Sequence, residues 1–271
     1  MNRFVRPLFA LAALVALSAC TTVPETGRRQ LLLTTAADET KMGLAAFEEV
    51  KKETAIATDA GQRARIERIG RRIAAAVGRS LPDAQWEFVV FNDDATVNAF
   101  ALPGGKVGVY TGLIKLAASD DEIAIVIGHE IAHVTSRHGG ERMSQAQLAG
   151  MIGTGLDAYA SGKKYGQIAS TVFGLGAQGV LLKYSRDQES EADGIGLRFA
   201  AGAGYDPRAA AAFWRKMQAK AGGKETFKWL STHPPTAERI AHLEQIAPGL
   251  MSVYEAARNG TRGDRVIGSA H

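Results

Sequence analysis

Residues 120–137 read DDEIAIVIGHEIAHVTSR, and this stretch decides the fold. The acidic residues 120–122 favour a helix start there, because the helix dipole places partial positive charge at its N-terminus. The apolar residues 123–127 follow, so the pattern predicts a deeply buried helix that runs to about Arg137. His129 and His133 are four residues apart and therefore share one face of that helix.

The two histidines flank a carboxylate in the pattern His129-Glu130-x-x-His133. Both imidazoles can reach one metal ion, and Glu130 lies next to that face, where it can contact a water molecule on the metal. Burying three such polar side chains on one helix destabilises the folded protein unless they have hydrogen-bond or metal partners. A zinc ion would supply the partner, and the alternative is a pair of hydrogen-bonded core histidines.

A catalytic zinc needs a third protein ligand and one open position. The metzincin pattern would place Gly at 136 and His at 139, but this chain has Ser136 and Gly139. His138 is one residue out of register and is expected to be structural.

A later acidic segment, Glu189-Ser190-Glu191-Ala192-Asp193, offers the missing carboxylate. Glu189 and Asp193 are four apart and face the same way, so one can bind zinc while the other accepts the N–H of a ligating histidine. Glu191 points away from that face and is expected to be a surface charge or to form an ion pair.

With these motifs the chain resembles the M48 family of zinc metallopeptidases, in particular its lipoprotein branch of Oma1-like and LoiP-type quality-control proteases. The resemblance covers about residues 24–246. Further stretches carry it: Thr26–Gln30, Asn98–Gly105, Tyr184–Gln188 and Ser231–Pro235.

The resemblance implies roles for the site residues and a gluzincin-like core. His129, His133 and Glu189 would hold one Zn²⁺ per chain, Glu130 would act as the general base, and Asp193 would orient His129. The implied fold is α+β and mostly helical, with a small β-sheet packed on the helix that carries the two histidines.

The remaining pattern fits this fold class. Helical periodicity covers 36–52 and 61–77. Strands are predicted at 86–91 and 106–110, and 97–102 is expected to be extended. After Thr111 the chain is predicted to be almost entirely helical. The uncharged stretch 165–182 is expected to form packed helices or a face resting on lipid, because its glycines and polar residues dilute its hydrophobicity.

The first twenty residues have the pattern of a secretory signal. Arg3 and Arg6 precede the apolar run 8–17, and the motif Leu17-Ser18-Ala19-Cys20 resembles a lipobox. A lipidated Cys20 would hold the protein on a membrane at the periplasmic face of a bacterial cell envelope, and Thr21 after it favours the outer membrane. The domain prediction is a signal peptide (1–19), a tether (20–35), a metallopeptidase domain (36–250) and a C-terminal tail (251–271).

Composition narrows the possible functions. The chain of 271 residues is 46% hydrophobic and 22% charged, which excludes a disordered chain. Its formal net charge of +4 is too small to argue for nucleic acid as a partner. Its single cysteine excludes an internal disulfide.

The predicted activity is hydrolysis of peptide bonds in unfolded or misassembled envelope proteins. The edge strand 97–102, with Asn98, Ala99 and Phe100, would bind substrate by main-chain hydrogen bonds. Two alternatives stay open: a lipid-anchored chaperone or assembly factor with a mainly structural zinc, and a zinc exopeptidase that uses an extra carboxylate, for which Glu191 is the candidate.

Two residues near the C-terminus have open roles. His233, in Ser231-Thr232-His233-Pro234-Pro235, can donate to the developing oxyanion, bind the zinc as a fourth ligand that switches the enzyme off, or order the turn. Arg239 can neutralise charge near the site, but pairing with an acid elsewhere is favoured.

Overall fold

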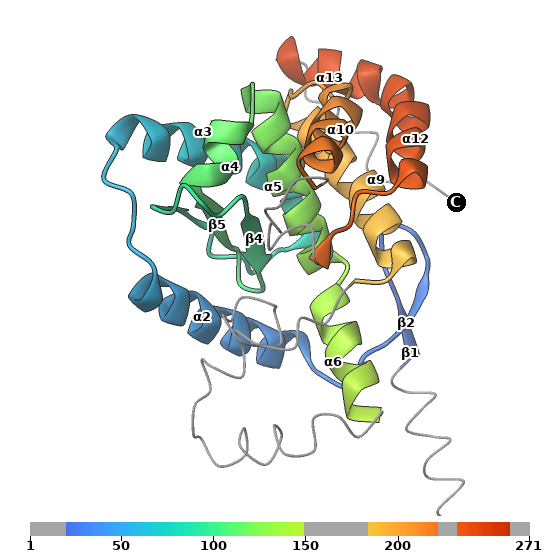
Figure 1. Ribbon diagram of the computed structural model, residues 1–271. Helices are drawn as coiled ribbons and strands as arrows, with labels where there is room; N and C mark the ends of the chain where they lie inside the picture. Colours follow the sequence, from blue (N-terminus) through green and yellow to red (C-terminus); the bar gives the residue numbers. More distant parts are fainter. Residues whose placement is uncertain (1–19, 149–183, 222–231, 261–271) are drawn as a thin grey trace, which may run out of the picture.

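The computed structural model describes residues 20–148, 184–221 and 232–260, arranged as helices around a small sheet (Figure 1). The strands are β1 (Cys20–Thr22), β2 (Arg29–Leu31), β3 (Glu87–Phe91), β4 (Ala99–Leu102) and β5 (Lys106–Tyr110). The helices are α2 (Ala36–Glu53), α3 (Ala60–Val77), α4 (Thr111–Leu116), α5 (Asp120–Thr135), α6 (His138–Leu148), α9 (Arg186–Gly202), α10 (Ala209–Ala221), α12 (Ala237–Ile246) and α13 (Met251–Arg258). Short 3₁₀ turns follow α3 (Gly78–Ser80) and α12 (Ala247–Leu250).

The central sheet has the strand order β3-β5-β4, with β3 parallel and β4 antiparallel to β5. Successive side chains of a strand point to opposite faces, so the sheet separates two apolar layers. Val90 and Val109 belong to the core shared with α3 and α5. Phe91 and Phe100 pack against Phe47 of α2 on the other face. Strand β4 is therefore an edge strand of a sheet covered on both faces.

Helix α5 is buried along almost its whole length, because the apolar run 123–127 covers every side of its N-terminal half. Its N-terminus is capped by the Ser119 hydroxyl, which accepts a hydrogen bond from the Glu122 amide. It crosses α9 where two glycines meet: a Cβ on Gly128 would lie 2.6 Å from the carbonyl oxygen of Gly196. The absence of side chains at this crossing lets the two backbones approach, so that side chains of α9 reach those of α5.

The structure confirms the predicted fold class, a mostly helical α+β core with a small sheet on the helix that carries the histidines. The strand predicted at 106–110 is β5, and the helices predicted at 36–52 and 61–77 are α2 and α3 with shifts of one residue at their ends. Helix α5 ends at Thr135, two residues before the predicted end.

The segment 20–35 differs from the tether expected there. Strands β1 and β2 form an antiparallel hairpin, and Val23 in its connection is fully buried. The hairpin was not predicted, because strands of three residues show too little alternation of apolar and polar residues to be detected.

The predicted tail also contains regular structure, because α13 packs against α9, while 261–271 lie outside the described residues. The stretch 165–182 lies outside them as well. Among the described helices, none combines the length and apolar character that a membrane span requires.

Candidate metal centre

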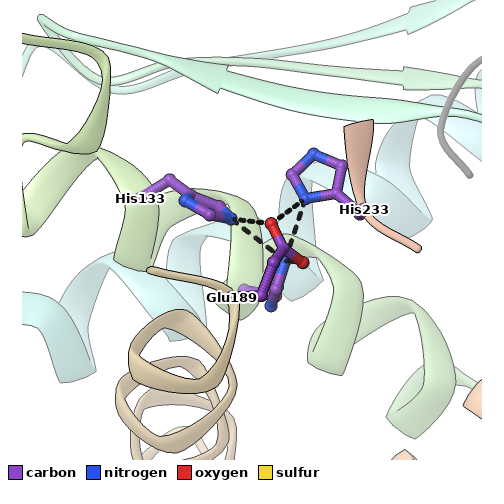
Figure 2. Close-up of side chains that lie close together, drawn as sticks. His133, Glu189 and His233 are labelled. Atoms are coloured by element: carbon purple, nitrogen blue, oxygen red, sulfur yellow. Dashed lines mark hydrogen bonds and ion pairs between the residues drawn. The ribbon is translucent and has the colours of Figure 1, made fainter. Parts of the chain in front are cut away.

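Four side chains from three segments meet beneath the sheet (Figure 2). His129 and His133 project from one face of α5. Glu189 lies in the first turn of α9, whose start is fixed by a capping box in which Ser185 and Gln188 each satisfy the other's backbone amide. His233 enters from the segment that precedes α12.

Most donor atoms of this cluster have the spacing of a tetrahedral metal site, while the His233 Nδ1 and the Glu189 Oε1 lie closer together, at 2.8 Å. The Nε2 atoms of His129 and His133 are 3.1 Å apart, and the Glu189 oxygens lie 3.4 Å from the Nε2 of His133 and 3.6 Å from that of His129. The His233 Nδ1 lies 3.3 Å from the His129 Nε2. A tetrahedral ion with bonds of about 2.0–2.1 Å requires donors about 3.3 Å apart.

The electrostatics of the cluster also suit a cation. All four side chains are buried, and burial keeps the pKa of the His133 ring well below its usual range, so the ring is neutral. Burial would raise the pKa of Glu189, but the neighbouring His233, His133 and Arg239 side chains lower it well below its usual range. Ring nitrogens and an ionised carboxylate converge on one point, which suits a metal ion that prefers nitrogen and oxygen ligands.

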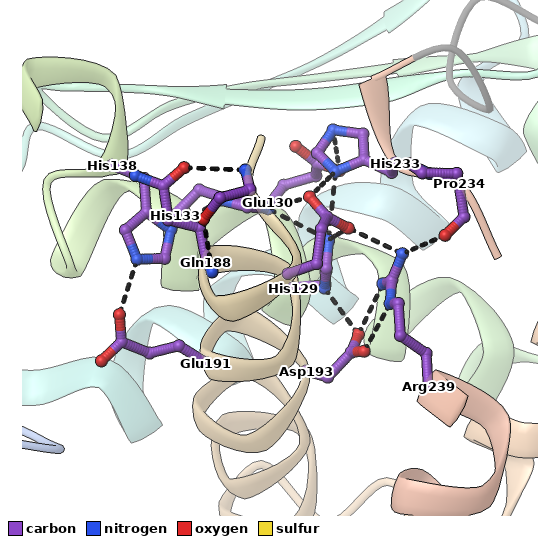
Figure 3. A network of polar contacts seen from close by, with 12 residues as sticks. His129, Glu130, His133, His138, Gln188, Glu191, Asp193, His233, Pro234 and Arg239 are labelled. Carbon is purple, nitrogen blue, oxygen red and sulfur yellow. Dashed lines mark hydrogen bonds and ion pairs between the residues drawn. The ribbon is translucent and has the colours of Figure 1, made fainter. Parts of the chain in front are cut away.

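On the His129 side, a carboxylate and a guanidinium lie directly behind the ligand (Figure 3). The Asp193 Oδ1 is 3.0 Å from the His129 Nδ1. Burial lowers the pKa of His129, but the hydrogen bond and charge of Asp193 outweigh it and raise the pKa. Arg239 donates to both oxygens of Asp193 at 2.7 and 2.8 Å, and its Nη1 lies 2.7 Å from the Glu189 Oε2.

On the His133 side, a second imidazole lies between the ligand and a carboxylate. The Nδ1 atoms of His133 and His138 are 2.8 Å apart, and the His138 Nε2 is 2.8 Å from the Glu191 Oε2. Tyr184 stacks on the His133 ring with centroids 3.8 Å apart. The His133 ring is thus held by the Tyr184 ring stacked on its face and by the His138 contact at its Nδ1.

Glu130 is buried beside the ligands, and its Oε1 is 3.7 Å from the His233 Nε2. A hollow next to His133 is lined by Ala101 of β4, by Pro103 and by Tyr184. The edge strand therefore borders the metal cluster, as the sequence led us to expect.

Ala99 and Phe100 are buried, and the Phe100 ring belongs to the core against α2. Their side chains are therefore not positioned to contact a substrate, and any contribution to substrate binding comes from their main chain. Asn98 is partly exposed. Of this strand, the residue that borders the hollow is Ala101, which the sequence analysis did not single out.

The structure brings together His129, Glu130, His133, Glu189, Asp193 and His233, all of which the sequence analysis named. The favoured interpretation of Arg239 as a residue paired elsewhere was wrong, because it binds Asp193 and Glu189 at the cluster. Glu191 forms the expected ion pair, with Arg28 at 2.7 Å, but it is buried and not on the surface. Its carboxylate is engaged behind His138 and does not face the cluster.

Two residues of the site were missed. His138 was assigned a structural role, although its contact with His133 places it directly behind a predicted ligand. Tyr184 was quoted only as part of a motif, and an aromatic residue five positions before Glu189 was the available signal.

Comparison with known proteins agrees with this geometry. The family model for peptidase family M48 matches residues 60–247. The chain is 38% identical over 185 residues to the mitochondrial metalloendopeptidase OMA1 of Schizosaccharomyces pombe, which covers 68% of this chain and 52% of that protein. It is 33% identical over 162 residues to the beta-barrel assembly-enhancing protease of Escherichia coli, covering 57% of this chain and 32% of that protein. The aligned region thus spans about half or less of the length of these relatives.

Proposed function

The chain belongs to peptidase family M48, and from this premise we propose that it is a zinc metalloendopeptidase of the bacterial cell envelope that hydrolyses misfolded or misassembled proteins. The observation that carries the proposal is the placement of Glu130. Its carboxylate is buried next to the face of α5 that carries His129 and His133, and its Oε1 lies 3.7 Å from the His233 Nε2.

The proposed chemistry assigns one task to each residue. His129, His133 and Glu189 would hold a zinc ion, which would supply Lewis acidity that polarises the scissile carbonyl and acidifies the attacking water. Glu130 accepts the proton of that water and returns it to the departing amine. Asp193 fixes the orientation and tautomer of His129, and Arg239 holds Asp193 in place.

The substrate class is argued from the edge strand beside the site. An extended peptide that adds to β4 is recognised through its main chain, so little sequence is read. Unfolded segments are the polypeptides that offer such a main chain. The relative from Escherichia coli is named as a protease that enhances β-barrel assembly, which supports an envelope role for this chain.

The test compares the zinc-loaded wild type with Glu130→Gln on an unfolded model protein such as casein. Glutamine keeps the shape of the side chain but cannot accept the proton, so proteolysis should be abolished while one zinc per chain remains bound. Glu67→Gln is the matched control, because Glu67 lies on the surface of α3 and pairs with Arg71. Equal activity of Glu130→Gln and wild type would remove Glu130 from the mechanism.

His233, the fourth donor of the cluster, is the observation that favours a second candidate function. Structural zinc sites normally have four protein ligands, and His233 supplies a fourth. A lipid-anchored chaperone or assembly factor with a structural zinc would not need Glu130, so the same experiment separates the two candidates. The exopeptidase alternative is weakened, because Glu191 is held by His138 and Arg28.

We also propose that Cys20 carries the lipid anchor. Cys20 is exposed at the start of β1, so an acyl chain there would not disturb the core. Each buried methylene of such a chain contributes about 0.8 kcal/mol to membrane binding. Cys20→Ser should leave the protein unprocessed or mislocalised, measured by membrane fractionation and intact mass. Unchanged fractionation, together with a wild-type mass that lacks acyl chains, would contradict the anchor.

A further inference from the structure

A hydrogen-bonded chain, buried from Glu191 inward, runs from the N-terminal hairpin to the metal cluster. It begins at Arg28, which directly precedes β2. The Arg28 Nε donates a hydrogen bond to the Glu191 Oε2 at 2.7 Å. The same carboxylate oxygen lies 2.8 Å from the His138 Nε2, and the His138 Nδ1 lies 2.8 Å from the Nδ1 of His133. The Thr26 hydroxyl also donates to Glu191.

The order of these groups fixes where each proton lies. A carboxylate only accepts, so the Nε2 of His138 is the donor and, in a neutral ring, its Nδ1 is the acceptor. His133 must then donate from its own Nδ1. Its Nε2, the atom that faces His129 and Glu189, is left with the lone pair that a metal requires.

A second branch from Arg28 supports the other ligand helix. Its Nη1 and Nη2 donate to the two oxygens of Glu141 at 2.9 and 2.8 Å. Glu141 also accepts from the Gln188 side chain at 2.8 Å, and Gln188 is the capping residue directly before Glu189. One guanidinium of the hairpin therefore contacts both carboxylates that stand behind the metal ligands.

Burial makes these contacts hard to replace by water. His138 is fully buried, and Glu141 and Glu191 are 5% and 8% exposed. Without Arg28, two buried carboxylates would lose the cation that lies between them, which favours their movement. Movement of Glu191 displaces the acceptor that orients His138.

We propose that the N-terminal hairpin, residues 20–31, is a positioning element of the metal centre, which acts through Arg28, Glu191 and His138 on His133. Docking of the hairpin sets the affinity of the cluster for its metal. The metal centre then needs the hairpin for full metal affinity, although the hairpin lies more than a hundred residues before His133 in the chain. The proposal rests on the metal site of the proposed function, but not on peptide hydrolysis.

The test measures metal binding directly in the full chain. Arg28→Ala should weaken Zn²⁺ affinity about tenfold in competition with a chromogenic chelator, near the lower end of the 10- to 100-fold range for residues behind a ligand. Arg29→Ala is the matched control, because this neighbouring arginine is exposed and its loss changes the charge equally. It should keep the wild-type affinity within about twofold.

A spectroscopic measurement separates positioning from general stability. The visible absorption of the Co²⁺-loaded protein reports ligand geometry, and it should change in Arg28→Ala but not in Arg29→Ala. Glu191→Gln retains an acceptor oxygen for His138, so it should bind Zn²⁺ more tightly than Glu191→Leu. Arg28→Ala should add little to the loss in Glu191→Leu, because both act through one chain of contacts.

A lower melting temperature of Arg28→Ala with unchanged Zn²⁺ affinity and an unchanged Co²⁺ spectrum would overturn the proposal, since the hairpin would then be structural only. Additive losses in the double variant would overturn it as well. Because metal binding is measured without substrate, an inactive wild type would contradict the proposed function and leave this result standing.

Discussion

The two candidate histidine ligands lie one helical turn apart on α5, but they are supported in different ways. His129 contacts Asp193 directly, and Asp193 is held by Arg239 of α12. His133 reaches Glu191 only through His138, and Glu191 is held by Arg28 of the N-terminal hairpin. Both carboxylates come from α9, two residues apart, and each is paired with one arginine.

The difference lies in how firmly each arginine is enclosed. The Arg239 side chain is 5% exposed and lies among helices of the core, whereas that of Arg28 is 25% exposed and belongs to a short hairpin. The His129 side is therefore built into the helical body. The His133 side depends on the short N-terminal hairpin, so we expect it to be the side on which metal affinity is adjusted.

The largest effect is expected when Glu189, the donor shared by the His129 side and the His133 side, is removed. Glu189→Ala should reduce bound zinc from about one ion per chain to almost none, because its two oxygens face both histidines. Metal analysis of the purified protein checks this. Asp187→Ala is the control, an exposed acid in the same helical turn, and it should keep full zinc. Full zinc in Glu189→Ala would refute its assignment as the third ligand.

An intermediate effect tests the comparison itself. Asp193→Ala should weaken Zn²⁺ binding by about 10- to 100-fold, since it deletes a direct contact to a ligand. Glu191→Ala should retain one zinc at saturating metal and show a smaller loss of affinity, because His138 still contacts His133. Chelator competition on both variants gives the order. An equal loss, or a larger one in Glu191→Ala, would show that the two sides do not differ as described.

The smallest change in zinc affinity is expected for His233, the donor that belongs neither to the His129 side nor to the His133 side. In His233→Ala, three donors remain, so zinc should stay bound. We expect basal casein degradation and self-cleavage to rise, because the fourth donor would otherwise occupy the position that substrate needs. A fall of about 10²- to 10³-fold with full zinc would instead assign His233 to oxyanion stabilisation. Unchanged activity would leave it as a turn residue.

The residues that sequence reasoning placed correctly are related by short-range geometry. His129 and His133 are four apart on a helix, as are Glu189 and Asp193, and helical periodicity alone puts each pair on one face. The start of α5 was predicted from the acidic residues 120–122, and the structure adds the Ser119 cap that the sequence analysis did not name.

His138 shows where such reasoning fails. On a continuous helix, residues five apart are about 140° apart around the axis, so His138 would not meet His133. Helix α5 instead ends at Thr135, and Arg137 adopts a positive φ of 54°. Arg137 is held there by Glu39 at 2.7 Å and by the Thr34 carbonyl oxygen at 2.8 Å. A new helix, α6, therefore starts at His138, and its first residue is directed back at the ligand.

The sequence by itself determined the ligand helix and which residues share one helix face, His129 with His133 and Glu189 with Asp193, because these depend on residues four positions apart. The resemblance to family M48 implied the fold class and the convergence of the two pairs on one metal. Only the tertiary structure decided what stands behind each ligand. Arg239 and Arg28 lie 46 and 163 residues from the carboxylates they hold. No local periodicity relates such distant positions. The packing of α12 on α9 and the docking of the hairpin bring them together.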